Sequence, residues 1–411
     1  MVETVANVSE YGARKGPVFY GTRIHMAPLD MRRILLLTIT ISLIAVQSVF
    51  AEPWLPIHDD EVLESLPIGA PSGLALEVAV DATLEQAIAS ARASLLLGQR
   101  YSDPRQYGYA EATLASWNQR NPGDPRLAVL NARIQQFRHD FDGAKERLHA
   151  LLKTNPDQSE AWLLLATIEQ VQGNFTPARA ACTRVAGQGD LLTAITCGAG
   201  VASLTGSAQT NADLLQRQLQ ASSNNADAIR IWAWTLLGEM RARLGEAVAA
   251  TAAFQEALRI DPEDVYARSA YADVELQRDR PQAALDLIGD RTNADALLLR
   301  AAIAARRAKS PAAAELGAAF GERVDEMSRR GDLTHRRELA RAALELDDDA
   351  NAALTLALDN WKVQREPADA LLVLQSSLAS GQKNSAAEVI DFVQANKLED
   401  VRIAALIKEL R

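Results

Sequence analysis

A spacing of 34 residues recurs along this chain of 411 residues and restricts its fold more than any other feature. An early copy is loose and contains Leu97, Gly98, Tyr101 and Ala110. A later copy contains Trp162, Leu165, Gly173, Phe175 and Ala178. The fullest copy contains Trp234, Leu237, Gly238, Gly245, Ala250, Phe254, Ala257 and Pro262. Small and large residues at fixed offsets are what two antiparallel helices need in order to pack on each other and on the next pair.

The repeat frame predicts where each unit begins and ends. Clear copies span 91–124, 125–158, 159–192, 231–264 and 265–298, and degenerate copies span 317–350 and 351–384. Residues 191–222 are expected to form two more helices, 294–308 and 312–329 longer atypical ones, and 385–396 and 399–410 a final pair. No stretch alternates apolar and polar residues with period two, so we expect almost no sheet. The whole of 83–411 is predicted to be an all-α solenoid.

The N-terminal region has the pattern of a secretory signal peptide. Met31, Arg32 and Arg33 precede the apolar run Ile34–Phe50, and a small residue, Ala51, follows it. This pattern predicts a signal peptide over 31–51 that is cleaved after Ala51, with 1–30 as an over-extended start. Residues 52–82 are rich in proline and acidic residues and are expected to be an extended lead-in. The alternative is an uncleaved single-span anchor formed by Ile34–Phe50, although this run is short for a membrane span.

Two cysteines become informative if the chain is exported. Cys182 is expected in the second helix of one unit and Cys197 in the first helix of the next, at similar distances from the turn between them. This placement allows a disulfide in an oxidising compartment, stabilising by up to about 3 kcal/mol. The alternative is two buried thiols that act as small apolar residues. A redox or metal-binding role is disfavoured because the spacing is not C-x-x-C and no histidine accompanies it.

Composition and motifs argue against nucleic-acid binding and catalysis. The formal net charge is −10, whereas nucleic-acid binding needs a basic face. None of the five histidines has a metal-ligand spacing, and the chain has neither a G-x-S-x-G motif nor a Walker loop. We therefore expect no enzyme activity, no cofactor and no metal. A deep pocket that gathers histidine or carboxylate side chains would favour an enzyme instead.

The repeated residues resemble those of the tetratricopeptide repeat (TPR) family. The resemblance implies a right-handed α-solenoid of helix–turn–helix units whose first helices line a concave groove. Carried over residue by residue, the family's groove positions give Arg126, Arg133, Phe137, Trp232, Glu239, Arg243, Tyr266 and Asp273. The alternative for Trp232 and Tyr266 is that they only pack against the adjacent repeat. The family's carboxylate clamp is absent, because these faces lack the required lysine and asparagine set.

Compartment and family resemblance together give the expected function. The chain is expected to be a non-catalytic, exported or periplasmic scaffold that binds a protein or peptide partner in the concave groove. Cell-envelope assembly or export is the expected setting. The alternative is a subunit of an envelope complex that is tethered to the inner membrane by the uncleaved Ile34–Phe50 segment.

Overall fold

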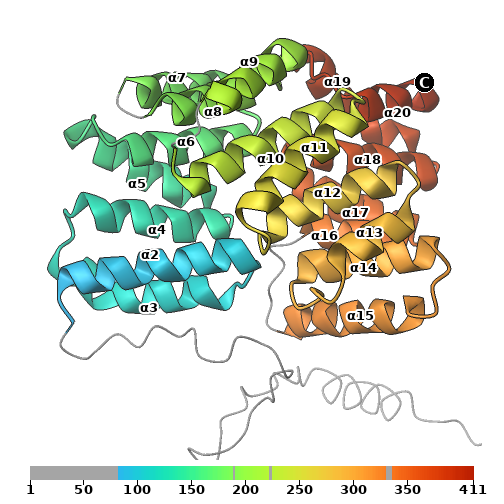
Figure 1. Cartoon of the computed structure of the whole chain (residues 1–411), viewed down its shortest axis with the longest axis horizontal. Helices are drawn as coiled ribbons and strands as arrows, with labels where there is room; N and C mark the ends of the chain where they lie inside the picture. Colours follow the sequence, from blue (N-terminus) through green and yellow to red (C-terminus); the bar gives the residue numbers. More distant parts are fainter. Residues whose placement is uncertain (1–81, 188–189, 222–224, 330–335) are drawn as a thin grey trace, which may run out of the picture. The chain divides into compact units, whose positions relative to one another are not determined.

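The computed structural model describes residues 82–187, 190–221, 225–329 and 336–411, which belong to one compact unit, Gly69–Arg411. The predicted over-extended start, signal peptide and, apart from Ala82, Pro-rich lead-in lie outside the described residues. The described part contains nineteen α-helices and one short 3₁₀-helix, and no strand (Figure 1). None of the described helices is long and apolar enough to cross a membrane. The all-α solenoid prediction is therefore confirmed for these residues.

The helices alternate between two structural roles. The even-numbered helices are α2 (Leu84–Tyr101), α4 (Pro125–Phe137), α6 (Ser159–Val171), α8 (Leu191–Ala202), α10 (Asp227–Arg243), α12 (Val265–Gln277), α14 (Asp295–Arg307), α16 (Arg336–Glu345), α18 (Pro367–Ala379) and α20 (Val401–Leu410). The odd-numbered helices are α3 (Arg105–Arg120), α5 (Phe141–Thr154), α7 (Phe175–Ala186), α9 (Ala208–Ala221), α11 (Ala247–Ile260), α13 (Pro281–Ile288), α15 (Ala313–Arg329), α17 (Ala350–Trp361) and α19 (Ala387–Asn396), the last preceded by η1 (Lys383–Ala386).

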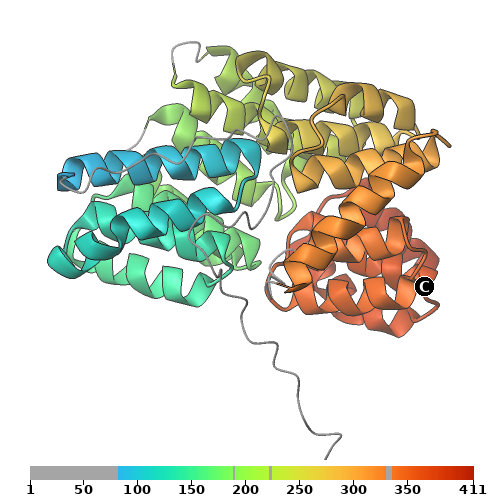
Figure 2. The same cartoon turned by 90° about the horizontal axis from the view of Figure 1, so that it is seen from below.

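Contacts between units identify which helices form the inner wall. Each even-numbered helix from α2 to α18 contacts the next even-numbered helix, whereas in the described residues no two consecutive odd-numbered helices approach each other as closely. Elements on the inside of a curved stack lie closer together than those on the outside. The even-numbered helices therefore form the inner wall, and each one from α2 to α18 is paired with the odd-numbered helix that follows it. Figure 2 shows the stacked helices from a second direction.

Local sequence explains why these helices form and pack closely. Asp264 caps the start of α12, because its carboxylate accepts a hydrogen bond from the Ala267 N–H at 2.8 Å. Within the pair of α10 and α11, Gly238 lies against the ring of Phe254, and a Cβ at this position would come within 2.7 Å of that ring. Ala250 is fully buried in the same interface. These residues occupy the offsets that define the repeat, so the repeat pattern is a packing requirement.

The turn inside each unit has a constant backbone feature. Every even-numbered helix from α2 to α18 is followed within four residues by a residue with positive φ. These residues are Ser102, His139, Gly173, Gly206, Gly245, Asp279, Lys309, Asp348 and Gly381, with φ between 51° and 81°. Four of the nine are glycine, the residue that adopts this conformation without steric cost. At the remaining five turns the left-handed residue is not glycine, so the sequence does not reveal the turn.

This turn gives the C-terminal helices a phase that differs from that of the predicted degenerate copies 317–350 and 351–384. These copies would make α15 and α17 the first helices of their units, but α15 packs against α14, and α17 follows α16 as its outer partner. The clear copy 265–298 also extends past its unit, because α13 ends at Ile288 and α14 begins at Asp295. The left-handed residue between α14 and α15 is Lys309, so no glycine marks this turn.

C-terminal units pack against units five or six positions earlier in the chain. One buried core cluster contains Phe175 of α7 together with Trp361 of α17, and Phe392 of α19 packs against it. The Arg365 N–H donates a hydrogen bond to the Val171 carbonyl at 2.7 Å. Another contact joins the Ala208 N–H to a carboxylate oxygen of Glu399 at 2.6 Å. At the N-terminal end, Arg100 forms an ion pair with Asp261, which precedes α12, at 2.6 Å.

The early turns have glycine where the C-terminal units approach them. A Cβ on Gly173 would lie 2.9 Å from the ring of Phe392, and one on Gly206 would lie 3.1 Å from Lys397. Gly381 has the same left-handed backbone, with φ 71°, but nothing lies within 4 Å of a Cβ there. Glycine at 173 is therefore required by backbone conformation and by tertiary packing together.

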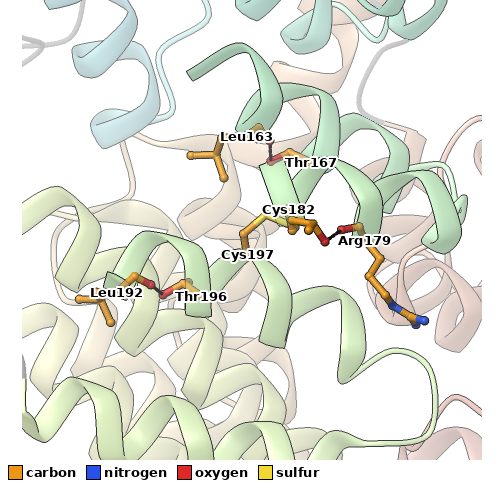
Figure 3. Close-up of a disulfide and its surroundings, with 8 residues drawn as sticks. Leu163, Thr167, Arg179, Cys182, Leu192, Thr196 and Cys197 are labelled. Carbon is orange, nitrogen blue, oxygen red and sulfur yellow. Dashed lines mark hydrogen bonds between the residues drawn. A yellow bond between two sulfur atoms is a disulfide. The ribbon is translucent and has the colours of Figure 1, made fainter. Parts of the chain in front are cut away.

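A disulfide joins two consecutive units. Cys182 of α7 and Cys197 of α8 are bonded, with their Cα atoms 5.5 Å apart and 15 residues apart in sequence (Figure 3). Both side chains belong to the buried core cluster that also contains Phe175. In the described residues there is no free cysteine. The bond closes a loop of a size for which about 3 kcal/mol of stabilisation is typical.

We predict that Gly173→Ala destabilises the protein more than Gly381→Ala. Both substitutions place a side chain at positive φ, but only the first also forces a Cβ into Phe392. Overpacking of this kind costs about 1–3 kcal/mol, which should appear as the difference between the two variants in urea unfolding. Phe392→Ala in the Gly173→Ala background should remove most of that difference. Equal losses for the two variants would contradict the packing between distant units.

Candidate binding cavity

The inner wall lines a partly open cavity with a volume of about 680 Å³. Every even-numbered helix from α6 to α20 contributes to its lining, and α10, α12, α14, α16 and α18 supply most of the side chains. The volume falls within the range of small-molecule sites, roughly 300–1,000 Å³. Because the C-terminal units pack against earlier ones, the concave groove that the family resemblance implies is here a partly closed cavity.

The cavity lining is strongly charged but balanced. It contains six arginines, Arg243, Arg300, Arg307, Arg337, Arg341 and Arg402. It also contains six acidic residues, Glu239, Asp273, Asp279, Glu338, Glu345 and Glu366. No histidine lines the cavity. Most of the arginines are used to hold acidic side chains of neighbouring helices, so their role is in part structural.

Asp273 on α12 connects three inner helices. Its two carboxylate oxygens accept hydrogen bonds from Arg300 of α14 at 2.7 Å and from Arg341 of α16 at 2.6 Å. Arg341 also contacts Glu345 at 2.8 Å, and Glu345 pairs with Arg307. Burial alone would raise the pKa of Asp273, but the positive charges of Arg300 and Arg341 outweigh it and hold that pKa below its usual value of 3.8. Asp273 therefore stays ionised at neutral pH.

A second network joins α16, α17 and α18. Arg337 pairs with Glu366 and with Asp369, and the Asn360 amide donates to Asp369 at 2.7 Å. The side chain of Asp369 has no solvent exposure, and burial raises its pKa to about 6 despite the opposing charge of Arg337. This network leaves Glu366 and Arg337 at the cavity wall with their charges already paired.

Glu239 and Tyr266 form a contact that is not an ion pair. The Tyr266 hydroxyl donates a hydrogen bond to a carboxylate oxygen of Glu239 at 2.6 Å. Burial raises the pKa of Glu239, and the nearby charge of Glu239 raises the pKa of Tyr266 well above its usual value. Tyr266 nevertheless exposes 58% of its surface, and it lines the cavity. The tyrosine is therefore a neutral hydrogen-bond donor with an accessible ring.

Arg243 lies one helical turn after Glu239 on α10 and is deeply buried. It is 6% exposed, and its guanidinium donates to the Ser203 hydroxyl at 2.7 Å. Its Nε has no hydrogen-bond partner, and within the described residues it forms no ion pair. Burial lowers its pKa. Arg243 and Glu239 are thus two charges of opposite sign at the wall without a bonded counter-charge.

The structure brings together four of the eight predicted groove residues. Glu239, Arg243, Tyr266 and Asp273 line the cavity. The other four lie elsewhere and make contacts within the chain: Arg126 pairs with Asp124 and Glu85, Arg133 pairs with Glu160, Phe137 stacks on Tyr107, and Trp232 packs against the core.

Sequence reasoning missed the contribution of the C-terminal units to the cavity. Arg300, Arg337, Arg341, Glu345 and Glu366 come from α14, α16 and the start of α18. Arg300 lies between the predicted copies 265–298 and 317–350, and the phase predicted from residue 317 onward did not place the other four in a first helix. A frame that begins at Asp295, where α14 starts, would have placed Arg300 in a first helix.

The described residues hold no group of histidine, cysteine and acidic side chains arranged for a metal ion. Carboxylates do gather in the cavity, which is the feature that would favour an enzyme. Asp273, Glu345 and Glu366, however, are bonded to arginines. No cofactor-binding motif accompanies them in the lining.

We predict that Asp273→Asn lowers the free energy of unfolding by about 3 kcal/mol at pH 7, because it leaves two partly buried arginines without their shared counter-charge. Since the pKa of Asp273 is lowered in the folded protein, its stabilisation is present above pH 3.8 and is lost as the pH falls further. The difference between wild type and variant in urea unfolding should therefore shrink below that pH. Asp142→Asn, which removes a carboxylate 93% exposed, is the control. An equal loss for both variants would refute the role given to Asp273.

Comparison of the sequence and the structure with known proteins found only limited similarity. No family model and no curated protein matches the sequence. The human IFIT1 dimer with PPP-AAAA has 15% identity and a TM-score of 0.43, over 75% of this chain and 71% of that chain. The P58(IPK) TPR domain has 13% identity and a TM-score of 0.24, over 78% of this chain and 97% of that chain. Yeast Tom70 has 12% identity and a TM-score of 0.25, over 78% and 94%. These identities and TM-scores are too low to support an inference about the function of this chain.

The chain's own paired helices, recurring left-handed turns and repeated small and large residues make it a TPR-like repeat protein.

Proposed function

We propose that this TPR-like protein is an exported, non-catalytic scaffold that binds a protein or peptide partner at its inner wall. The observation that carries the proposal is the cavity of about 680 Å³ lined by successive first helices. Eight helices converge there, so a ligand in the cavity contacts many units at once. Burial of a ligand among several elements is how small sites reach useful affinity.

The arrangement of charges supports binding in preference to catalysis. A general acid or base must be able to exchange a proton with a substrate. Asp273 is held ionised by Arg300 and Arg341, and Glu366 is bonded to Arg337. Such paired groups shape and polarise a cavity without providing a reactive group.

Export is supported by two independent observations. The arginines and apolar run of residues 32–50 resemble a signal peptide, and the mature region contains a disulfide between Cys182 and Cys197. Structural disulfides persist in oxidising compartments and are rare in the cytosol. The alternative is a membrane-tethered subunit of an envelope complex, in which Ile34–Phe50 remains uncleaved as an anchor.

We predict that the exported protein begins at Glu52. N-terminal sequencing and intact-mass measurement of the protein from envelope and soluble extracytoplasmic fractions check this. If the protein is found in the membrane fraction with a mass that still includes Ile34–Phe50, the tethered alternative is correct and the soluble scaffold is not. Recovery of the whole protein in the cytosol would overturn export.

We predict that filling the cavity abolishes partner binding. Ala368 lines the cavity and is exposed, so Ala368→Trp places a large ring inside it without deleting a native contact. Ala112, on the outer helix α3, is exposed outside the cavity, and Ala112→Trp is the matched control. Crosslinked partners from envelope fractions should be lost with Ala368→Trp and kept with Ala112→Trp. Retention of every partner by both variants would disprove binding at the inner wall.

A further inference from the structure

Four charged residues that line the cavity form no ion pair in the described residues, namely Glu239, Asp279, Glu338 and Arg243. Asp273, Glu345 and Glu366 are each bonded to at least one arginine. Glu239 has no ion pair in the described residues, and its hydrogen bond comes from the neutral Tyr266. Glu239 is partly buried, and a partly buried carboxylate without a bonded counter-ion loses part of its hydration, so its persistence in the wall of a cavity points to a ligand.

The cavity-wall charges that lack an ion pair are mostly negative. Glu239, Asp279 and Glu338 are acidic, and Arg243 is the basic residue among them in the described residues. Glu366 and Arg337 contribute opposing fields at Glu239, and Arg337 is already bonded to both Glu366 and Asp369. Arg243 attracts Glu239 but is bonded to Ser203 instead. The unpaired charge of the wall therefore favours a positively charged ligand over an anion.

Two neighbouring side chains on α12 add the other features that an organic cation needs. Tyr266 exposes 58% of its surface beside the carboxylate, and a cation over an aromatic face gains roughly 0.5–2 kcal/mol. Ser269 follows one helical turn later and also lines the cavity. Ser269 is 5% exposed, and its hydroxyl oxygen has no hydrogen-bond partner. This hydroxyl can donate or accept a hydrogen bond and has no partner in the described residues.

We propose that Glu239, Tyr266 and Ser269 bind an ammonium or guanidinium group, supplied by a lysine or arginine side chain of the partner polypeptide. Glu239 provides a charge-assisted hydrogen bond, Tyr266 provides the aromatic face, and Ser269 accepts a further N–H. The cavity volume of about 680 Å³ admits such a side chain with adjoining backbone. That the source is a polypeptide rests on the proposed function, whereas the cationic chemistry rests on these three residues.

The test is calorimetric titration of the full chain with capped glycine pentapeptides that carry a central lysine, arginine or norleucine. The lysine or arginine peptide should bind saturably at millimolar concentration, and the norleucine peptide should not. Glu239→Gln should weaken binding by about tenfold or more, because a charge-assisted bond is lost. Tyr266→Leu should weaken it about threefold, whereas Tyr266→Phe, which keeps the ring, should bind within about twofold of wild type.

Glu338→Gln is the matched control, because Glu338 lines the same cavity but is not bonded to Tyr266. It should change binding less than about twofold, and urea unfolding should show that every variant remains folded. Equal weakening by Glu338→Gln and Glu239→Gln, binding of the norleucine peptide, or no binding of either basic peptide would overturn the proposal.

A parallel titration with n-butylammonium tests whether the bound cation must belong to a polypeptide. Weaker binding of n-butylammonium than of the lysine peptide supports a polypeptide source. Equal binding, with the same sensitivity to Glu239→Gln, would leave the cation site intact and remove its link to a polypeptide. Loss of partners with Ala368→Trp but not with Glu239→Gln would instead retain the proposed scaffold function and refute the cation site.

Discussion

The packing of C-terminal units on the glycine turns of earlier units governs the rest of this structure. Phe392 lies against Gly173 and Lys397 against Gly206, so residues more than 190 apart in sequence share one core. A simple solenoid has only nearest-neighbour interfaces. Here contacts between distant units partly close the inner wall, and this partial closure turns a concave surface into a half-open cavity.

Closure also explains the chemistry of the cavity wall. Charged residues suit an inner face that is open to water, but enclosure removes part of their hydration. Networks such as Arg300–Asp273–Arg341 offset that loss by linking α12, α14 and α16. Because a half-satisfied network is costly, the paired groups fix the relative positions of these helices. Glu239 lies outside these networks, because Arg337 is bonded to Glu366 and Asp369 and Arg243 is bonded to Ser203.

Sequence could predict much of the fold because packing residues recur at fixed offsets. The glycines at 173 and 245 mark the left-handed turns of two units directly, and the helices on either side follow from them. The positions of the turns after α14 and α16 could not be found in this way, since Lys309 and Asp348 adopt the same backbone conformation without a glycine. The candidate site was half predicted for the same reason: Tyr266 and Asp273 lie in a recognisable copy, whereas Arg337 and Arg341 do not. Contacts between distant units leave no periodic mark in a sequence.

The covalent bond between Cys182 and Cys197 has a consequence for how the array comes apart. Repeat arrays can fray from their ends, one interface at a time, and such partial opening is the low-energy route to exposed surface. The bond spans the boundary between α7 and α8, so fraying that starts at α2 cannot detach the first three units from the fourth while the cystine is intact. An oxidising environment thereby keeps the third and fourth units together, and a reducing one would remove this covalent limit on fraying from the N-terminal end.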